Sequence, residues 1–373
     1  MSDVVALFTE LAAVPSPPGE ERAVADRVIA YVRALALDVD EDDAGSRIDS
    51  SMGNLLCRVP PTNGGGLPLF FCAHLDTVPP EGPIEPVVDD GVVRNGGGTI
   101  LGADNKAAVA VMLEATRRVM AENRPHAGIE LLFTPKEEVG LRGAEAFDHE
   151  RLAARVGYVF DHAAPIGDVI LGAPFQRKIT VEFRGRAAHS GMYPEEGRSA
   201  IVAAARAIAD LRLGRIDEET TANVGQISGG TARNIIPDRC SFAAEARCHD
   251  ERKLGELVQE MLDTVTFAAG VSECDVETSV GRAARGYRFR RDDLPVRLAA
   301  EALEQAGFEP RYGLSGGGAD ANVFNERGLQ CLNLANGMAN IHTSDEQIAV
   351  DDLERMVDVT LALTDAALRC EAQ

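Results

Sequence analysis

The sequence predicts an α/β fold in which a domain with a mostly parallel sheet is interrupted by an inserted ferredoxin-like α+β domain. Two observations predict the parallel sheet. Continuous apolar runs at 67–73 and 129–134 are typical of strands buried on both faces, and such runs alternate with helical segments along the chain. A third observation predicts the insertion, because apolar and polar residues alternate from Ile179 to Arg184, as in a strand with one buried face.

The segments of the first domain follow one another in the order that a parallel sheet requires. We expect strands at 54–59, 67–74 and 129–134, one that ends at 158–160, and later strands at 311–314 and 330–334. We expect helices at 3–13, 20–36, 293–306 and 351–369, and others that begin near Asp104 and Ala319. The polar segment 38–51 is expected to be an exposed loop, and residues 79–99 a long ordered excursion.

The inserted domain has the order β-α-β-β-α-β of the ferredoxin-like module. Its strands are expected near 179–184, 222–228, 239–248 and 274–280, and its helices at 198–213 and from Leu254 onward. The expected boundaries are 1–175 for the first part of the interrupted domain, 176–288 for the insertion, and 289–373 for the second part.

The composition argues against several classes of protein. The 373 residues include 37 Lys and Arg against 59 Asp and Glu, a formal charge of −22, which argues against nucleic acid and anionic membrane surfaces as partners. No apolar run reaches the length of a membrane span. Seven cysteines without close pairs do not suggest a disulfide framework. The N-terminus lacks a basic segment followed by an apolar one, so we expect a cytoplasmic protein.

His74 follows the apolar run 67–73 directly, at the carboxyl end of a predicted parallel strand. Ligands of open α/β sheets bind beyond such strand ends. An imidazole there can bind a divalent metal ion, and Asp76 is placed to accept the N–H of the other ring nitrogen. The alternative is a surface His–Asp pair without a further role.

Other acids and one histidine occupy equivalent positions. Asp104 lies at a helix start, where it can also serve as an N-cap. Glu137 and Glu138 follow a strand, although adjacent acids are often only solvated. Asp161 ends a third strand and His342 follows a fourth. One crevice could collect these groups, and two histidines with three carboxylates suit a pair of divalent ions. A further carboxylate would then be free to act as a base.

Two neighbouring residues are interpreted as structural. His162 follows Asp161 on the strand and is expected to face solvent, because successive strand side chains point in opposite directions. Cys72 lies one strand step behind His74 and is expected to belong to the core rather than to bind metal.

Eight sequence blocks cover nearly the whole chain: HLDTVPP at 74–80, GADNKAAVA at 102–110, TPKEEVGLRGA at 134–144, FD at 160–161, AAHSGMYPEEGRSA at 187–200, GGTARNIIPD at 229–238, GGGADANVF at 316–324 and NIHTSDE at 340–346. In these blocks and in their order, the chain resembles the di-zinc exopeptidase family that contains peptidase T (tripeptide aminopeptidase), carboxypeptidase G and the acyl-amino-acid deacylases. The forms TPKEEVGL and GGADAN resemble the peptidase T-like branch most.

The resemblance implies a role for each residue of the predicted crevice. The metal ligands would be His74, Asp104 as the bridge between both ions, Glu138, Asp161 and His342. Asp76 would orient His74, and Glu137 would be the general base acting on a water that bridges the metals. The implied cofactors are two divalent metal ions, Zn²⁺ first and Co²⁺ or Mn²⁺ as alternatives.

The resemblance also implies that the inserted domain serves as a lid and a dimerisation domain. His189 would donate an imidazole N–H to the developing oxyanion when the lid closes, in dimeric members from the partner subunit. Arg233 and Asn234 would contact substrate, although a plain hairpin turn also explains this block. The implied partners are a short peptide or related small amide and a second copy of the chain.

We therefore expect a metal-dependent hydrolase that cleaves a peptide bond of short peptides, as a tripeptidase-like aminopeptidase does. Two alternatives stay open. One is an N-acyl amino-acid deacylase or a carboxypeptidase of the same family. The other is a catalytically silent metal-binding protein, which the presence of both Glu137 and Glu138 argues against.

Overall fold

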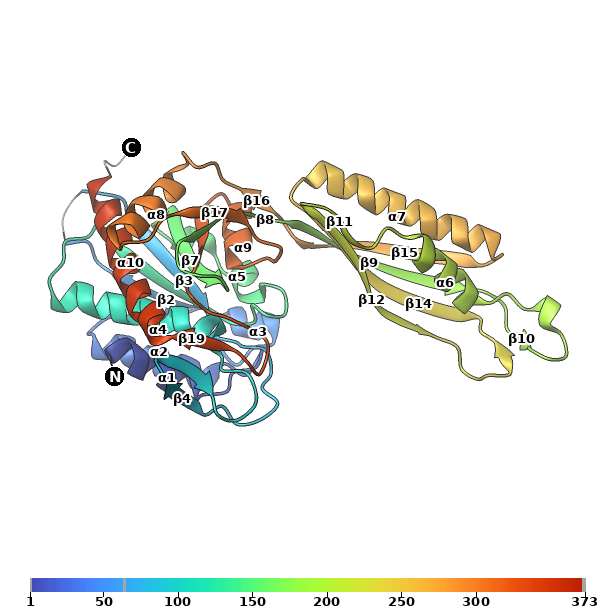
Figure 1. Cartoon of the computed structure of the whole chain (residues 1–373), viewed down its shortest axis with the longest axis horizontal. Helices are drawn as coiled ribbons and strands as arrows, with labels where there is room; N and C mark the ends of the chain where they lie inside the picture. Colours follow the sequence, from blue (N-terminus) through green and yellow to red (C-terminus); the bar gives the residue numbers. More distant parts are fainter. Residues whose placement is uncertain (1, 63–64, 371–373) are drawn as a thin grey trace. The chain divides into compact units, whose positions relative to one another are not determined.

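The computed structural model describes residues 2–62 and 65–370, without the side chains of residues 282 and 283. The chain forms two compact units. The first unit comprises Met1–Gly172 and Arg288–Gln373, and the second comprises Ala173–Tyr287 (Figure 1). The second unit is therefore one continuous insertion into the sequence of the first.

The first unit is built on a mixed sheet, which has nine strands in the described part of the chain. Its order is β1-β2-β6-β3-β7-β18-β8-β16, and β17 pairs with β8. The strands are β1 (Val39–Glu41), β2 (Leu55–Val59), β3 (Leu69–His74), β6 (Ile129–Thr134), β7 (Val156–His162), β8 (Asp168–Ala173), β16 (Tyr287–Arg288), β17 (Arg311–Leu314) and β18 (Gln330–Ala335). The neighbours β6, β3, β7 and β18 run parallel, which confirms the predicted mostly parallel α/β fold.

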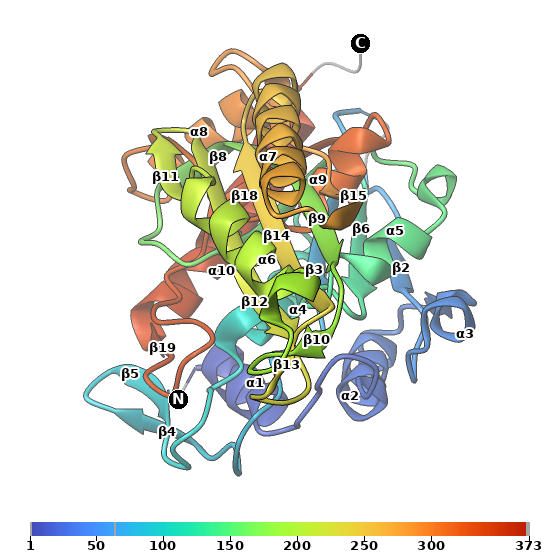
Figure 2. The same ribbon diagram turned by 90° about the vertical axis from the view of Figure 1, so that its right-hand side faces the viewer.

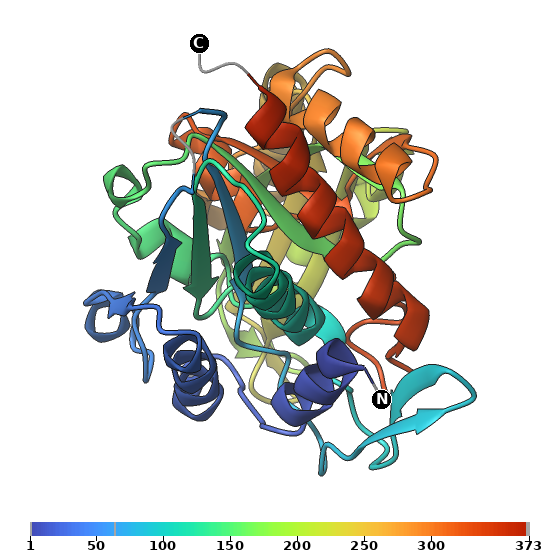
Figure 3. The same cartoon turned by 90° about the vertical axis from the view of Figure 1, so that its left-hand side faces the viewer.

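Helices cover both faces of this sheet. The larger hydrophobic core lies under α1 (Asp3–Ala12), α2 (Arg22–Ala34), α4 (Ala103–Ala121), α8 (Leu294–Gln305) and α10 (Val350–Arg369). Figure 3 shows α4, in teal, and α10, in red, in front of the sheet. The shorter helices α5 (Arg142–Ala146) and α9 (Asp320–Glu326) contact each other and lie on the opposite face.

Adjacent residues of β3 show how one strand serves both faces. The ring of Phe71 packs with Tyr158 and Phe160 of β7 in the larger core. The ring of Phe70 contacts Phe324 of α9, with 5.2 Å between the ring centroids. Because β3 is buried on both faces, its sequence is apolar from Leu69 to Ala73 rather than alternating.

The polar segment 38–51 differs from its expectation, because it forms β1 and the short helix α3 (Ala44–Ile48) instead of an exposed loop. The Asp42 carboxylate accepts hydrogen bonds from the backbone N–H groups of Ala44, at 2.9 Å, and Asn54, at 2.7 Å. Its second oxygen accepts the side-chain amide of Asn54 at 2.9 Å. These bonds order the segment although few of its residues are apolar.

The excursion 79–99 forms the hairpin β4 (Pro86–Asp89) and β5 (Val92–Asn95). A third strand, β19 (Gln347–Ala349), pairs antiparallel with β5 and follows the His342 segment in sequence. The excursion is thereby tied to a part of the chain that lies far away in sequence.

The second unit contains an antiparallel sheet in the order β11-β12-β14-β9-β15. Its strands are β9 (Phe175–Arg184), β11 (Gly214–Asp217), β12 (Thr220–Gly229), β14 (Arg239–Cys248) and β15 (Asp275–Ala284), with the short pair β10 (Ala188–His189) and β13 (Ile235–Ile236) beyond them. Helices α6 (Ala200–Asp210) and α7 (Glu251–Val271) lie side by side against this sheet (Figure 2). The order β9, α6, β12, β14, α7, β15 is that of the ferredoxin-like module, with β11 added at one edge.

Among residues 2–62 and 65–370, none of the helices has both the length and the apolar composition that crossing a membrane requires.

We predict that Gly157→Ala destabilises the first unit. A Cβ at this position in β7 would lie 2.3 Å from the ring of Phe70, which cannot withdraw because it is fully buried against Phe324. The expected loss is about 1–3 kcal/mol of unfolding free energy, measured as a lower urea midpoint. Gly313→Ala in β17 is the matched control, because a Cβ there meets nothing within 4 Å. A wild-type midpoint for Gly157→Ala would contradict this packing.

Candidate metal centre

Five side chains with metal-binding chemistry come together at the carboxyl edge of the parallel strands. His74 is the last residue of β3, Asp161 is the second-last residue of β7, and Glu138 follows β6. Asp104 lies in the first turn of α4, and His342 lies in the segment after β18. Since β6, β3, β7 and β18 are parallel neighbours, their carboxyl ends meet at one edge.

The five side chains form a continuous series of contacts, in the order Asp161, His74, Asp104, His342 and Glu138. His74 Nε2 lies 3.8 Å from Asp161 Oδ1 and 3.2 Å from Asp104 Oδ1. His342 Nε2 lies 3.2 Å from Asp104 Oδ2 and 3.0 Å from Glu138 Oε1. Each oxygen of Asp104 thus faces a different imidazole nitrogen, as expected of a carboxylate between two cation positions.

Burial and mutual contact shift the pKa values of this cluster strongly. Burial raises the pKa of Asp161 to about 7, and the charge of Asp104 adds to the rise. Burial also opposes ionisation of Asp104, but contacts with His342 and His74 hold its pKa well below the usual range. The contacts with Asp104 and Glu138 raise the pKa of His342 to about 10. Positive charge is therefore strongly favoured among these carboxylates.

His74 is oriented by the backbone of Asp76. The Nδ1 atom lies 2.8 Å from the Asp76 carbonyl oxygen, so Nδ1–H donates to that carbonyl and Nε2 keeps a lone pair for the centre. The sequence favours the Asp76 carboxylate as the partner, but its Oδ1 lies 3.5 Å from Nδ1. That carboxylate accepts the backbone N–H groups of Glu137, at 2.9 Å, and Glu138, at 3.0 Å.

Glu137 lies beside these side chains in a pocket of about 330 Å³. The pocket is lined by Asp104, Glu137, Glu138, Asp161, His162, Ala163, Ser315, Gly316, Gly317, Gly318, Ile341 and His342. Burial raises the pKa of the Glu137 carboxyl well above its usual range, while the charge of His74 opposes the rise. A carboxylate with a raised pKa that lines a pocket binds a proton more readily than an ordinary glutamate, as a general base must.

For two residues next to the centre, His162 and Cys72, the structure adds detail to what the sequence predicts. His162 is half-buried and lines the same pocket, instead of projecting from the surface. Cys72 is fully buried, and its thiol lies 3.7 Å from Asp320 Oδ2. The hydroxyl of Thr134 donates to the same oxygen at 2.6 Å. Burial raises the pKa of Asp320 to about 6, and the charge of Asp320 adds to the rise in the pKa of Glu137.

Glu346 holds the chain before α4 and was not singled out by the sequence. It is buried, and its Oε2 accepts the backbone N–H groups of Leu101 and Gly102, both at 2.8 Å. Its Oε1 accepts the N–H of Asp104 at 2.9 Å. The one feature of the sequence that could have pointed to Glu346 is its place as an acid shortly after His342 in the block NIHTSDE.

The donor atoms fit divalent metal ions. Imidazole nitrogens and carboxylate oxygens are the ligands that Zn²⁺ and related ions take in proteins. His74, Asp104 and Glu138 each offer a ligand atom within 4.8 Å of the others. With Asp161 on the side of His74, and His342 on the side of Glu138, the set can be divided between two ions that share Asp104.

The remaining predicted residues belong to the second unit, where the structure brings them together. His189 in β10 is paired with Ile235 in β13, and the N–H of Ser190 donates to the carbonyl of Asn234 at 3.0 Å. Arg233 and Asn234 are exposed, as is His189. The backbone N–H groups of Gly191 and Met192 lie 3.2 Å from His189 Nδ1, so Nδ1 accepts and Nε2–H remains free to donate.

Histidines and acids cluster at the carboxyl edge of the parallel sheet, and a further glutamate lies beside them. This arrangement is that of a metal-dependent hydrolase. The comparison with known families gives the particular class. The model of Peptidase family M20/M25/M40 matches residues 70–366, and the chain belongs to this family.

Individual relatives cover nearly the whole chain. The chain is 36% identical over 362 residues to the uncharacterized protein YqjE of Bacillus subtilis, covering 97% of each chain. The crystal structure of aminopeptidase PepT from Bacillus cereus superimposes with a TM-score of 0.92 at 38% identity and covers 98% of both chains. A tripeptidase from Staphylococcus aureus gives a TM-score of 0.95 at 34% identity, covering 99% of this chain and 98% of that one.

We predict that Glu346→Gln weakens metal binding without unfolding the protein. The amide nitrogen cannot accept a hydrogen bond, so part of the contact with Leu101, Gly102 and Asp104 is lost and Asp104 is less well positioned. Loss of such an outer contact typically costs about 10–100-fold in metal affinity, measurable by competition with a zinc chelator. The exposed neighbour provides the control, Asp345→Asn. Equal zinc affinities for the two variants would remove this role from Glu346.

Proposed function

We propose that the protein is an aminopeptidase that cleaves short peptides, in the manner of a tripeptidase, and that it uses two divalent metal ions. The observation that carries this proposal is the Asp104 carboxylate, whose two oxygens face His74 and His342 while Glu137 stands beside them. The names of the similar proteins, an aminopeptidase and a tripeptidase, support the choice of substrate.

The proposed ligands are His74, Asp104, Glu138, Asp161 and His342, with Asp104 shared between both ions. Zn²⁺ suits this donor set best, and Co²⁺ or Mn²⁺ are the alternatives. Two such ions, when bound, lower the pKa of an attacking water and polarise the scissile carbonyl.

Glu137 is the proposed general base. It accepts a proton from the attacking water and later delivers a proton to the leaving amine. Its backbone is fixed by the Asp76 carboxylate, which accepts the Glu137 N–H at 2.9 Å. Asp76 therefore positions both the base and, through its carbonyl, the His74 ring.

The second unit is the proposed lid. His189 would donate from Nε2–H to the oxyanion that develops at the scissile carbonyl, because its Nδ1 is already engaged by backbone N–H groups. Asn234 would donate an amide hydrogen bond to the peptide, and Arg233 would pair with its terminal carboxylate. The contact of the Asn234 carbonyl with Ser190 N–H supports a common role for the two loops.

We further infer a homodimer formed through the second unit. Ile201 and Val202 on α6, and Phe267 and Val271 on α7, expose large apolar side chains, as surfaces that pair with another protein do. A cytoplasmic location is supported by the seven cysteines, all of which are free thiols.

A panel of substrates separates this proposal from its alternatives. The zinc- or cobalt-loaded protein is assayed with tripeptides, with peptides blocked at either end, and with N-acyl amino acids. Release of the first residue from free tripeptides supports the proposal. Preference for N-acyl amino acids would identify a deacylase, preference for the carboxyl-terminal bond a carboxypeptidase, and no cleavage of any substrate a silent metal-binding protein.

We predict that Glu137→Gln abolishes most activity and keeps the metal content. The variant removes the base but none of the proposed ligands, and loss of a general base typically lowers kcat by about 10²–10⁴-fold. Metal content is measured by mass spectrometry of the purified protein, and kcat with a tripeptide. The contrasting variant is Asp104→Ala, which should lose metal because it removes the shared ligand. A Glu137→Gln protein that cleaves at the wild-type rate would rule out Glu137 as the base.

We predict that His189→Ala lowers kcat by about 10²-fold or more while metal content and folding stay unchanged. The variant removes an oxyanion donor, whose contact is strongest in the transition state. The matched control is Ser190→Ala, next to His189 on the same loop, since Ser190 contacts Asn234 through its backbone N–H, which the variant keeps.

Mixing two inactive proteins shows which subunit supplies His189. Glu137→Gln and His189→Ala are combined, and subunit exchange is verified by native mass spectrometry. If His189 acts across a dimer, mixed dimers contain one site with both groups and regain part of the activity. Verified exchange without recovery is the outcome that excludes donation across the dimer.

A further inference from the structure

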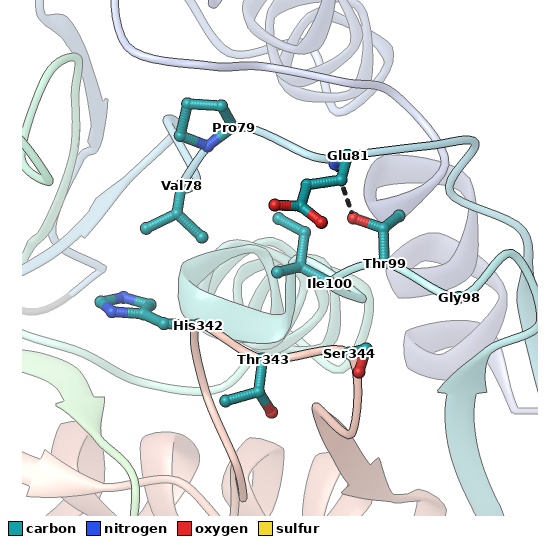
Figure 4. Close-up of a pocket in the computed structure, with 9 residues that line it drawn as sticks. All are labelled: Val78, Pro79, Glu81, Gly98, Thr99, Ile100, His342, Thr343 and Ser344. Carbon is teal, nitrogen blue, oxygen red and sulfur yellow. Dashed lines mark hydrogen bonds between the residues drawn. The ribbon is translucent and has the colours of Figure 1, made fainter.

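A second pocket, of about 340 Å³, adjoins the metal centre within the first unit. It is lined by Val78, Pro79, Glu81, Gly98, Thr99, Ile100, His342, Thr343 and Ser344 (Figure 4). We call it the Glu81 pocket. His342 lines both this pocket and the pocket that contains Glu137. A substrate bound at the metal centre can therefore extend past His342 into the Glu81 pocket.

The wall of the Glu81 pocket is held by a hydrogen-bond network centred on Asn95. The Asn95 side-chain amide donates to the carbonyls of Thr99 and Ile100, both at 3.0 Å, and to that of Pro83 at 3.3 Å. Its oxygen accepts the N–H of Glu85 at 2.7 Å. These bonds fix the two arms of the excursion, so the pocket is preformed rather than a gap in a loose loop.

The two sides of the Glu81 pocket are also joined to each other. Strand β5 of the excursion pairs with β19, which follows the segment that carries His342, Thr343 and Ser344. Across this pairing Arg94 Nε donates to Gln347 Oε1 at 2.8 Å. A pocket whose opposite walls are connected in one small sheet keeps its width when a ligand binds.

The lining of the pocket is mixed, with the hydroxyls of Thr99, Thr343 and Ser344 and the His342 ring beside an apolar part and one carboxylate, that of Glu81. Val78, Pro79 and Ile100 supply the apolar surface. The backbone N–H of Glu81 donates to the Thr99 hydroxyl at 2.8 Å, which anchors the residue while its carboxylate is turned inward, as Figure 4 shows. A small apolar residue that carries a positive charge is complementary to this surface.

A further pocket beside the centre contains both members of an ion pair, Arg311 and Asp168. It shares His162 with the Glu137 pocket and is lined by Arg311 and Tyr312. Its Arg311 Nε donates to Asp168 at 2.7 Å. The Asp168 carboxylate of this pocket is already engaged by Arg311, so the pocket gives an ammonium group no reason to bind there.

We propose that the Glu81 pocket binds the amino-terminal residue of the substrate, with its ammonium group paired to the Glu81 carboxylate. The inference rests on the proposed aminopeptidase function. In such a reaction the first residue carries the scissile carbonyl, so it must lie within one residue length, about 3.5 Å, of the metal centre. The Glu81 pocket begins at His342 and meets this requirement. An acylated amine has no positive charge, so the pocket selects peptides with a free amino terminus.

The test measures peptide binding separately from catalysis. Leu-Gly-Gly and N-acetyl-Leu-Gly-Gly are titrated by calorimetry into zinc-loaded Glu137→Gln protein, alone and combined with Glu81→Gln. Because Glu81 is exposed to solvent, removal of its charge should weaken Leu-Gly-Gly binding by about fivefold. Binding of the acetylated peptide should not change. The matched control is Glu85→Gln on the same excursion, because the Glu85 side chain does not line the pocket.

The outcomes separate the pocket from the proposed function. A loss confined to Leu-Gly-Gly in the Glu81→Gln background supports the pocket. Equal effects on both peptides, or no effect on either, overturn it, and cleavage of Leu-Gly-Gly by the wild-type enzyme then leaves the aminopeptidase proposal intact. Tighter binding and cleavage of acetylated substrates by the wild-type enzyme would overturn both. Failure of the wild-type protein to bind or cleave either peptide would also overturn both.

Discussion

The position of the Asp104 carboxylate between two imidazoles is the constraint on which the rest of the centre depends. Each of its oxygens lies 3.2 Å from a different histidine nitrogen, so a small rotation would break one contact while it improved the other. The backbone of Asp104 must therefore be fixed. Glu346, which lies 242 residues later in the sequence, fixes this backbone by accepting the Asp104 N–H. Gly102 permits the abrupt turn before α4 because it adopts a left-handed conformation with φ +77°.

Two buried carboxylates of this site accept hydrogen bonds from backbone N–H groups, and the buried Lys106 also interacts electrostatically with both. Asp76 accepts the N–H groups of Glu137 and Glu138, and Glu346 accepts those of Leu101, Gly102 and Asp104. Backbone dipoles satisfy an anion without adding a full positive charge. The arrangement therefore orders the loops of the site around Asp76 and Glu346.

The strand ends could be predicted from sequence because burial on both faces produces continuous apolar runs. The run that ends at His74 and the strand that ends near Asp161 both place a polar group where the apolar residues stop. The segment 38–51 could not be predicted in this way, since its order comes from Asp42 bonding to Asn54 rather than from apolar periodicity. The partner of His74 was equally inaccessible, because a backbone carbonyl leaves no signal in the choice of residue.

The function of Glu346 required tertiary information for a related reason. Its partners lie in the chain before α4, and only the return of the segment 340–349 along the excursion brings them within reach. This segment contributes His342 to the centre, Glu346 to the Asp104 loop, and Thr343 with Ser344 to the Glu81 pocket. Strand β19 then anchors it to β5. Because one short segment carries all of these contacts, displacement of the Glu81 pocket wall would also displace His342, which would couple the proposed recognition of a substrate terminus to the geometry of the candidate metal centre.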